Sequence, residues 1–201
     1  KFFNIGEREE TQPHLIDFAK PHWLMSKLDG SMIHPMLLDG QIVLCTRMGR
    51  TQHGMMAERH LTPALAAWFK DCLAAGWTPI CEWVAPDNRI VIKYPESKLI
   101  LLAIRNTETG EYMEPSAVRA NGLRAGLDTV DIHTPWGGSA QDFLGMVRAL
   151  LDAEGFVIRF ADGLWLKCKA EDYVRKSAAK SAIELEKNAL AVIMAGGLDD
   201  V

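Results

Sequence analysis

The pentapeptide Lys27-Leu28-Asp29-Gly30-Ser31 lies between two runs typical of β-strands, His22–Lys27 and Ser31–Leu38. An Asp-Gly pair between two such runs predicts a tight hairpin turn. A lysine that ends a strand beside a tight turn is held rigidly, and its amine can attack phosphorus or a carbonyl carbon when it is unprotonated. That state requires burial or nearby cations to lower the pKa of the amine. The alternative is a solvated turn lysine before an ordinary hairpin.

The rest of the chain mixes predicted hairpins with helices. Asp39-Gly40 predicts a second hairpin leading into Gln41–Thr46. Proline near the start and glycine past the end predict a helix over Ala64–Ala75, and Ser139 predicts the cap of a helix that reaches Leu151. The other expected strands are Thr78–Val84, Arg89–Tyr94, Lys98–Arg105, Phe156–Phe160 and Leu164–Lys169; Ala182–Ala195 is expected to be helical and Pro115–Pro135 a polar surface connection. This order predicts an α+β fold.

Length and composition fit a globular domain. The 201 residues are 48% hydrophobic and 24% charged, which excludes a disordered, collagenous or coiled-coil chain. No apolar run is long enough to span a membrane and no signal peptide opens the chain, so we expect no membrane partner and a cytoplasmic location. The four cysteines are widely spaced and form no CxxC pair, which predicts buried reduced thiols. The formal net charge of −4 argues against coating of nucleic acid by a basic surface.

Two lysines near the end of the chain form a second chemical signal. In the predicted strand Leu164–Lys169, Lys167 and Lys169 are two positions apart and therefore face the same side. Two aligned ammonium groups suit a polyphosphate, and they would also lower the pKa of a third amine nearby. The alternative is an exposed amphipathic edge strand. Glycine-rich phosphate loops and a GxSxG nucleophile are absent from the sequence.

Two carboxylates lie beside apolar strand sequence. Glu82 falls within Ile80–Val84, and Glu154 opens the sequence Glu-Gly-Phe-Val-Ile over 154–158. An acid among buried neighbours needs a cation, a metal or a hydroxyl as its partner. Glu154 could equally end the preceding helix.

Taken in order, these features resemble the motif set of the covalent nucleotidyltransferases, which comprise RNA ligases, DNA ligases and capping enzymes. Within that superfamily the chain is most similar to the phage-type RNA ligase 1 family, the tRNA-repair ligases. The stretches that carry this closer resemblance are Lys1–Asn4, Trp83–Val91, Lys98–Arg105 and Glu108–Tyr112. The similarity extends from Lys1 to about Tyr173.

The resemblance implies a fold and a division of the chain. Residues 1–180 would form a nucleotidyltransferase domain (the ATP-grasp-like ligase adenylation domain) of antiparallel sheets with flanking helices. Residues 181–201 would be a helical tail, the start of a C-terminal helical domain. The family's Arg-Gly element would lie upstream of Lys1. Many relatives stack an aromatic ring on adenine, but Leu99–Ala103 is aliphatic here, so the base would be held between aliphatic side chains.

The resemblance also implies roles for individual residues. Lys27 would attack the α-phosphorus of ATP and form lysyl-AMP, with Lys167 and Lys169 neutralising the α-phosphate. Glu82 would bind the ribose hydroxyls and Glu154 would hold a divalent metal, for which magnesium is expected. The remaining ATP contacts would come from Lys1 and Arg47.

The implied activity is that of an ATP-dependent RNA ligase that joins a 5′-phosphate to a 3′-hydroxyl, as in a nicked tRNA. An end-healing kinase–phosphatase would then be a partner, and a phage-encoded protein would act in the host cytoplasm. Two alternatives stay open. One is a DNA ligase or capping-type nucleotidyltransferase, and the other is a nucleotide- or RNA-end-binding module without full ligase activity.

Overall fold

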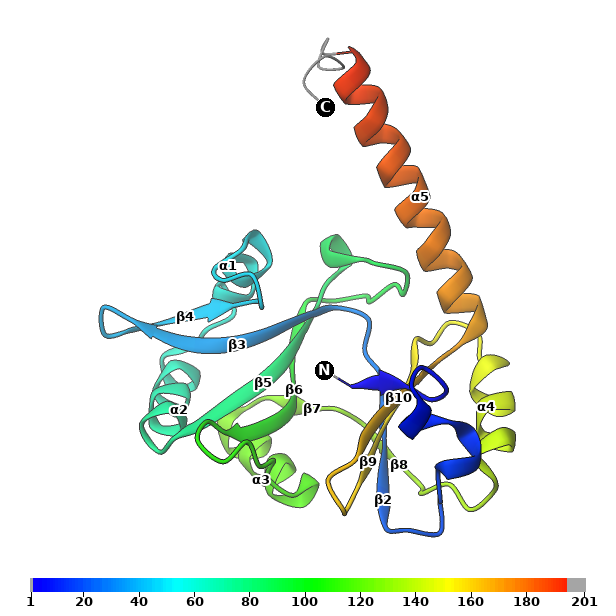
Figure 1. Cartoon of the computed structure of the whole chain (residues 1–201). Helices are drawn as coiled ribbons and strands as arrows, with labels where there is room; N and C mark the ends of the chain where they lie inside the picture. The colour runs from blue at the N-terminus through cyan, green and yellow to red at the C-terminus, as the bar shows by residue number, and fades with distance from the viewer. Residues whose placement is uncertain (1, 195–201) are drawn as a thin grey trace. The chain divides into compact units, whose positions relative to one another are not determined.

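The computed structural model describes residues 2–194, which fall into two compact units (Figure 1). Unit 1 comprises the chain up to Lys27 together with the residues from Thr134 onward, and unit 2 comprises Leu28–His133. The boundary therefore falls inside the pentapeptide, between Lys27 and Leu28. Each unit has its own antiparallel sheet core with flanking helices, which confirms the predicted α+β class.

Unit 1 is built on four strands in the order β1-β10-β9-β2. Its elements are β1 (Phe3–Asn4), 3-10 turns at Glu9–Thr11 and Pro13–Leu15, β2 (His22–Ser26), α4 (Ala140–Arg148), β9 (Gly155–Phe160), β10 (Trp165–Lys169) and α5 (Glu171–Met194). Ser139 caps α4 by accepting a hydrogen bond from the Asp142 amide, and α4 buries Phe143 and Val147 against one face of the sheet. The predicted hairpin of β9 and β10 is confirmed.

The other face of this sheet carries a row of rings and one arginine. Phe2 stacks on Trp165 with ring centroids 4.7 Å apart, and the Arg159 guanidinium lies 5.2 Å from the ring centroids of both Trp165 and Trp23. Trp165, Lys167 and Lys169 occupy every second position of β10, so the row of rings lies on the same face of the sheet as the two lysines. Cation–π contacts of this kind stabilise the strand order from which the lysines project.

Unit 2 has a five-stranded sheet in the order β4-β3-β5-β6-β7. Its elements are β3 (Ser31–Leu38), β4 (Gln41–Cys45), α1 (Gln52–Glu58), α2 (Pro63–Ala74), β5 (Trp77–Val84), a 3-10 turn at Pro86–Asn88, β6 (Lys98–Asn106), α3 (Pro115–Ala125), β7 (Asp128–Thr129) and β8 (Ile132–His133). The Asp39-Gly40 hairpin is confirmed, and both turn residues have positive φ, as such a two-residue turn requires. Thr62 caps α2 by accepting a hydrogen bond from the Leu65 amide.

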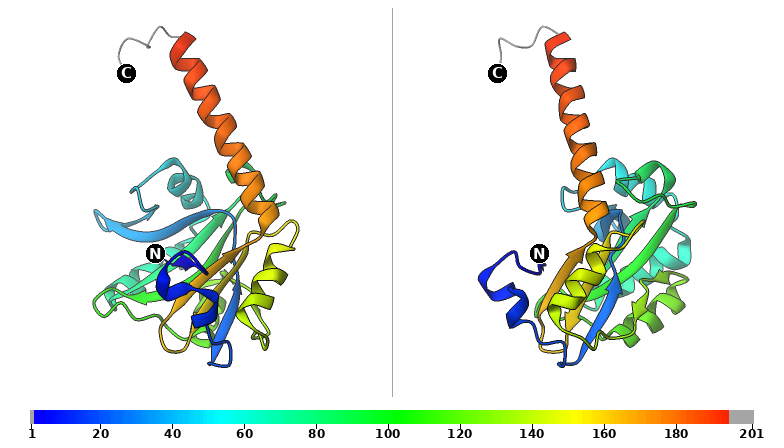
Figure 2. Two further views of the ribbon diagram at one scale, coloured as in Figure 1. Left: turned by 45° about the vertical axis from the view of Figure 1, so that its right-hand side comes forward. Right: turned by 90° about the vertical axis from the view of Figure 1, so that its right-hand side faces the viewer.

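Three expectations about local structure are wrong. Asp29-Gly30 is not a hairpin turn, because β2 pairs with β9 whereas β3 pairs with β4 and β5. The segment 89–94 is not a strand and pairs with no described strand. Much of the predicted polar connection 115–135 is α3, which begins at a proline and ends at Gly126 with φ 69°. The expected C-terminal helix is confirmed over residues 182–194, but it begins earlier, at Glu171; its first turns lie beside α4 before it extends away from the unit 1 sheet (Figure 2).

Candidate active site

Three predicted site residues meet in unit 1. Lys27 Nζ lies 2.7 Å from Glu154 Oε1, and Lys169 Nζ lies 3.0 Å from the same oxygen. The Glu154 side chain is 3% exposed, whereas the lysine side chains are 22% and 31% exposed. A buried carboxylate thus holds two partly accessible amines around one oxygen. The two lysines are the cationic partners that the buried Glu154 carboxylate requires. Glu154 therefore does more than end the preceding helix.

The backbone sets this geometry. The Lys27 amide donates to the Gly155 carbonyl (2.9 Å), and the Ala170 amide donates to the Glu154 carbonyl (2.9 Å). Gly155 has φ 135°, and a Cβ there would clash with the Cys168 carbonyl oxygen. The order Glu154-Gly155 is therefore required. Gly155 lets β10 approach the backbone of β9 closely, and the side chain of the preceding Glu154 reaches the lysines.

The predicted alternation on β10 is confirmed. Lys167 and Lys169 are half-buried on one face, and Cys168 is buried on the other. Burial raises the pKa of the Cys168 thiol to about 11, so this thiol is protonated at neutral pH and is a poor nucleophile. Lys169 Nζ also lies 4.9 Å from the centroid of the Tyr173 ring, which helps to fix its position.

The remainder of the pentapeptide is anchored within unit 2. Asp29 is 1% exposed, and its Oδ2 accepts hydrogen bonds from the amides of Val91 and Ile92, both at 2.7 Å. The Gly30 amide donates to Glu82 Oε1 (3.1 Å), and a Cβ on Gly30 would clash with the Trp83 carbonyl oxygen. Glycine is needed here for close packing rather than for a left-handed conformation.

A second group of hydrogen bonds fixes the chain that follows β5. Ser31 Oγ and Asn88 Oδ1 are 3.2 Å apart, and Asn88 Nδ2 donates to the Trp83 carbonyl (2.8 Å). The Asp29 amide donates to the Tyr94 hydroxyl (2.9 Å). The pentapeptide thereby holds the segment 88–94, which explains why that segment forms no strand.

Two of the other predicted residues, Glu82 and Arg47, belong to unit 2. Glu82 lies in unit 2 on β5, beside Met32 of β3 and Ile100 of β6 in the sheet register. Arg47 is exposed in the turn after β4, where Thr46 pairs with Gly49. Lys1 lies outside the described residues.

Asp29, Asn88 and Tyr94 are site residues that the sequence analysis missed. The sequence held one usable signal, since an acid directly after a buried strand needs hydrogen-bond donors, as Glu82 and Glu154 do. The Asp-Gly pair instead predicts a turn, and the donors to Asp29 lie more than sixty residues further along the chain.

The available side-chain donors determine which metal could bind. Among residues 2–194 no group of three His, Cys, Asp or Glu side chains could hold an ion, which excludes a closed protein cage there. Glu154 offers one carboxylate in the lysine cluster. Magnesium keeps several waters and is bound through one or two carboxylates plus substrate phosphates, so this donor set fits magnesium.

Comparison with solved structures defines the class of fold. An archaeal ATP-dependent RNA ligase superimposes with a TM-score of 0.60 at 19% identity, over 76% of this chain and 43% of that one. A Naegleria gruberi RNA ligase variant solved with ATP and Mn gives 0.61 at 18%, over 79% and 52%. The chain therefore has the nucleotidyltransferase fold of ATP-dependent RNA ligases, which confirms the predicted fold.

Sequence comparison identifies the family. The protein-family description that matches residues 1–177 is "RNA ligase", and the chain belongs to this RNA ligase family, as the resemblance to the phage-type enzymes implied. RNA ligase 1 of bacteriophage TS2126 is 26% identical over 171 residues, 79% of this chain and 42% of the phage protein.

A Thermovibrio ammonificans protein that is named provisionally as an RNA ligase is 35% identical over 117 residues, which are 56% of this chain and 30% of that protein. The chain thus spans less than half the length of these two relatives. Within residues 2–194 no helix has the length and apolar character needed to cross a membrane.

Proposed function

We propose that this chain carries the nucleotidyl-transfer chemistry of an ATP-dependent RNA ligase, with Lys27 as the nucleophile. The observation that carries the proposal is the buried Glu154 carboxylate that holds Lys27 and Lys169 within 3.0 Å of one oxygen. Membership of the RNA ligase family supports the same chemistry. Phosphoryl and nucleotidyl transfer depend mainly on positioning and charge neutralisation, and a cluster of this kind provides both.

The reaction has three balanced steps. Lys27 Nζ, once deprotonated and released from Glu154, attacks the α-phosphorus; a phosphorus–nitrogen bond forms and the bond to the bridging oxygen breaks, so pyrophosphate leaves. An oxygen of the RNA 5′-phosphate then attacks the same phosphorus, the phosphorus–nitrogen bond breaks, and Lys27 is regenerated. Finally the oxygen of the RNA 3′-hydroxyl gives up its proton and attacks the 5′-phosphorus. A phosphodiester bond forms, the bond between this phosphorus and AMP breaks, and AMP leaves.

The other residues take the roles implied by the resemblance. Lys167 and Lys169 neutralise the α-phosphate, and Glu82 binds the ribose hydroxyls. Arg47 contacts phosphate or ribose, and Lys1 lies near the phosphates. Glu154 would hold magnesium, and the bound ion would supply Lewis-acid stabilisation of the phosphate oxygens. Met32 and Ile100, the neighbours of Glu82 across β3 and β6, supply the aliphatic surface for adenine.

The proposal is tested by intact-protein mass spectrometry after incubation with ATP and magnesium. We expect the wild-type mass to increase by one AMP and Lys27→Ala to show no increase, because the variant lacks the attacking amine. Lys70→Ala, which removes an exposed lysine of α2, is the matched control and should retain the adduct. An adduct on Lys27→Ala would refute the assignment of the nucleophile.

The alternatives predict other outcomes. A nucleotide- or RNA-end-binding module would bind ATP without any gain in mass, and a capping-type enzyme would prefer GTP. Transfer to DNA ends rather than RNA ends would identify a DNA ligase.

The finer biological assignments belong to the same proposal. We propose RNA with 5′-phosphate and 3′-hydroxyl ends as substrate, an end-healing kinase–phosphatase as partner and the cytoplasm as the place of action. The four free cysteines fit a reducing compartment. The division into a catalytic domain over 1–180 and a helical tail over 181–201 stays a prediction, and α5 runs through that boundary without a break.

A further inference from the structure

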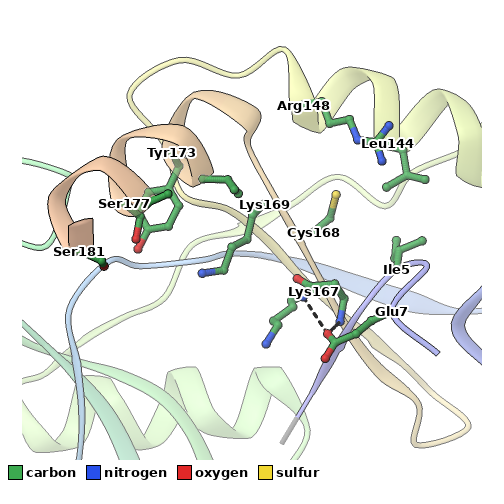
Figure 3. Close-up of a pocket in the computed structure, with 13 residues that line it drawn as sticks. Ile5, Glu7, Leu144, Arg148, Lys167, Cys168, Lys169, Tyr173, Ser177 and Ser181 are labelled. Atoms are coloured by element: carbon green, nitrogen blue, oxygen red, sulfur yellow. Dashed lines mark hydrogen bonds between the residues drawn. The ribbon is translucent and has the colours of Figure 1, made fainter. Parts of the chain in front are cut away.

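Tyr173 lies where β10 gives way to α5, beside a pocket of unit 1 that Lys167 and Lys169 also line (Figure 3). Tyr173 is 4% exposed, whereas Glu171 in the same turn of α5 is exposed to solvent. Close packing holds a buried side chain in a defined conformation. The fold therefore fixes one aromatic ring beside the lysine cluster.

The backbone ties the start of α5 to Glu154. The Ala170 amide, directly after β10, donates to the Glu154 carbonyl (2.9 Å), and the Val174 amide donates to the Ala170 carbonyl (3.1 Å). Ala170 is completely buried, so these bonds are shielded from water. The position of the Tyr173 ring is therefore set by backbone bonds and does not depend on the partners of the Glu154 carboxylate.

Lys169 has two partners of different kinds. Its Nζ lies 3.0 Å from Glu154 Oε1 and 4.9 Å from the centroid of the Tyr173 ring, over which it is placed. An ammonium group within about 6 Å of a ring centroid is attracted by the negative face of the ring. The bond to Glu154 depends on the charge of the carboxylate, whereas the attraction of the ring needs no charged partner. Loss of the first contact therefore leaves the second in place.

We propose that Tyr173 is a positioning residue whose ring keeps the Lys169 ammonium in the site when Glu154 exchanges partners. The inference rests on the proposed function, in which Lys27 leaves Glu154 to attack phosphorus and the same carboxylate turns to magnesium. Lys169 then shares its anionic partner with a divalent cation, which repels it, and the ring is the contact that remains. An ammonium held in this way neutralises the α-phosphate without first having to be ordered.

The first test compares two substitutions of Tyr173 by single-turnover labelling with radioactive ATP. Tyr173→Leu removes the ring, and the maximal rate of lysyl-AMP formation should fall by about 2–30-fold, the range that corresponds to one cation–π contact. The ATP concentration that gives half of this rate should change less, because the α-phosphate charge that Lys169 neutralises builds up in the transition state. Tyr173→Phe keeps the ring and should restore most of the lost rate. A Tyr173→Phe rate as low as that of Tyr173→Leu would refute the role of the ring.

The matched control is Tyr112→Leu, which removes a ring whose centroid lies 5.9 Å from the Arg105 guanidinium in unit 2. This control should label at the wild-type rate. Urea denaturation of each variant measures the folded fraction, and rates are compared per folded molecule. A fall in the control as large as that in Tyr173→Leu would show only a general effect of losing a ring and would overturn the proposal.

A double-mutant cycle shows whether Tyr173 acts through Lys169. Lys169→Met removes the ammonium but keeps a long side chain, and its own rate should be lower by on the order of 10²–10³. In that background Tyr173→Leu should cause no further loss, because the ring has no cation left to hold. An equal fractional loss in both backgrounds would show that the ring acts independently of Lys169, contrary to the proposal.

NMR gives a readout that does not need the reaction, because protons over the face of an aromatic ring resonate upfield. The ε-methylene protons of Lys169, identified by their absence in Lys169→Met, should resonate upfield in the wild type and return to their ordinary position in Tyr173→Leu. The upfield shift should persist when magnesium is added to saturation. Its loss on addition of magnesium would mean that the ring does not hold the ammonium, and the proposal would fail. If the shift persists but the wild type forms no lysyl-AMP, the proposed function fails while the hold of the ring on Lys169 stands.

Discussion

The two units use their charged groups differently. In unit 1 the central acid, Glu154, is bonded to the amines of Lys27 and Lys169. In unit 2 the buried acid, Asp29, is bonded to the backbone amides of Val91 and Ile92. The first arrangement can exchange partners during a reaction, whereas the second fixes the path of the chain.

The pentapeptide 27–31 joins these two arrangements. Lys27 belongs to unit 1, and the following Leu-Asp-Gly-Ser belongs to unit 2, where its polar groups are bonded to β5 and the segment after it. A short sequence therefore combines a nucleophile with the anchor that fixes where its chain goes next. The comparison predicts that an acid of unit 1 controls rate and an acid of unit 2 controls stability.

Glu154→Gln should have the largest effect on rate. The amide keeps the shape of the side chain but removes the charge that both lysines share, so the rate of lysyl-AMP formation should fall by on the order of 10²–10³. Single-turnover labelling with radioactive ATP measures this rate. The control is Asp152→Asn, which makes the same change two residues away at an exposed acid. A Glu154→Gln protein that labels at the wild-type rate would remove Glu154 from the chemistry.

Asp29→Ala should act mainly on stability. In the wild type the amides of Val91 and Ile92 donate to the buried Asp29 carboxylate at 2.7 Å. The substitution removes this charged acceptor from both amides. Bonds to charged groups contribute about 1.5–3 kcal/mol each, so the loss of both should lower the free energy of unfolding by about 3–6 kcal/mol. Asp29→Asn, which keeps one oxygen acceptor, should lose less.

Urea denaturation measures both variants of Asp29, and Asp87→Ala, at an exposed acid after β5, is the control. Unfolding of Asp29→Ala at the wild-type urea concentration would show that the amides of Val91 and Ile92 find other partners. The distinction between an anchoring acid and a reactive acid would then be lost.

What the sequence predicted correctly is local. The hairpin at Asp39-Gly40 and the cap at Ser139 depend on residues within four positions of each other, so their sequence determines them. The alternation of Lys167, Cys168 and Lys169 follows from strand geometry. Only the family resemblance placed Lys27 and Glu154 in one site, and their direct contact was not predicted, because no local rule joins residues so far apart.

What the sequence did not reveal depends on distant partners. Asp29-Gly30 has the composition of a hairpin turn, yet Asp29 bonds to Val91 and Ile92, and Gly30 packs against the Trp83 carbonyl. Those same bonds remove the segment 89–94 from strand pairing. α3 was missed because its sequence is polar, and its stability comes from burial of Val118 and Gly122 rather than from an apolar stripe.

Lowering the pH offers the mildest test of the view that the acids of unit 2 are structural. Glu58 of α1 accepts hydrogen bonds from Arg50 (2.7 Å) and from the Leu44 amide of β4 (2.9 Å), and the Arg50 contact holds the pKa of Glu58 below its usual range. A carboxyl whose pKa is lower in the folded state stabilises that state above the pKa of the unfolded chain, about 4.3, and loses this contribution as the pH falls through the folded value. The urea midpoint of Glu58→Gln should therefore lie below that of the wild type at pH 6–7, and the two should converge at about pH 3. Because Arg50 is half exposed, the difference should be the smallest of those predicted. A gap that persisted unchanged at pH 3 would mean that Glu58 stabilises unit 2 by packing rather than by its charge.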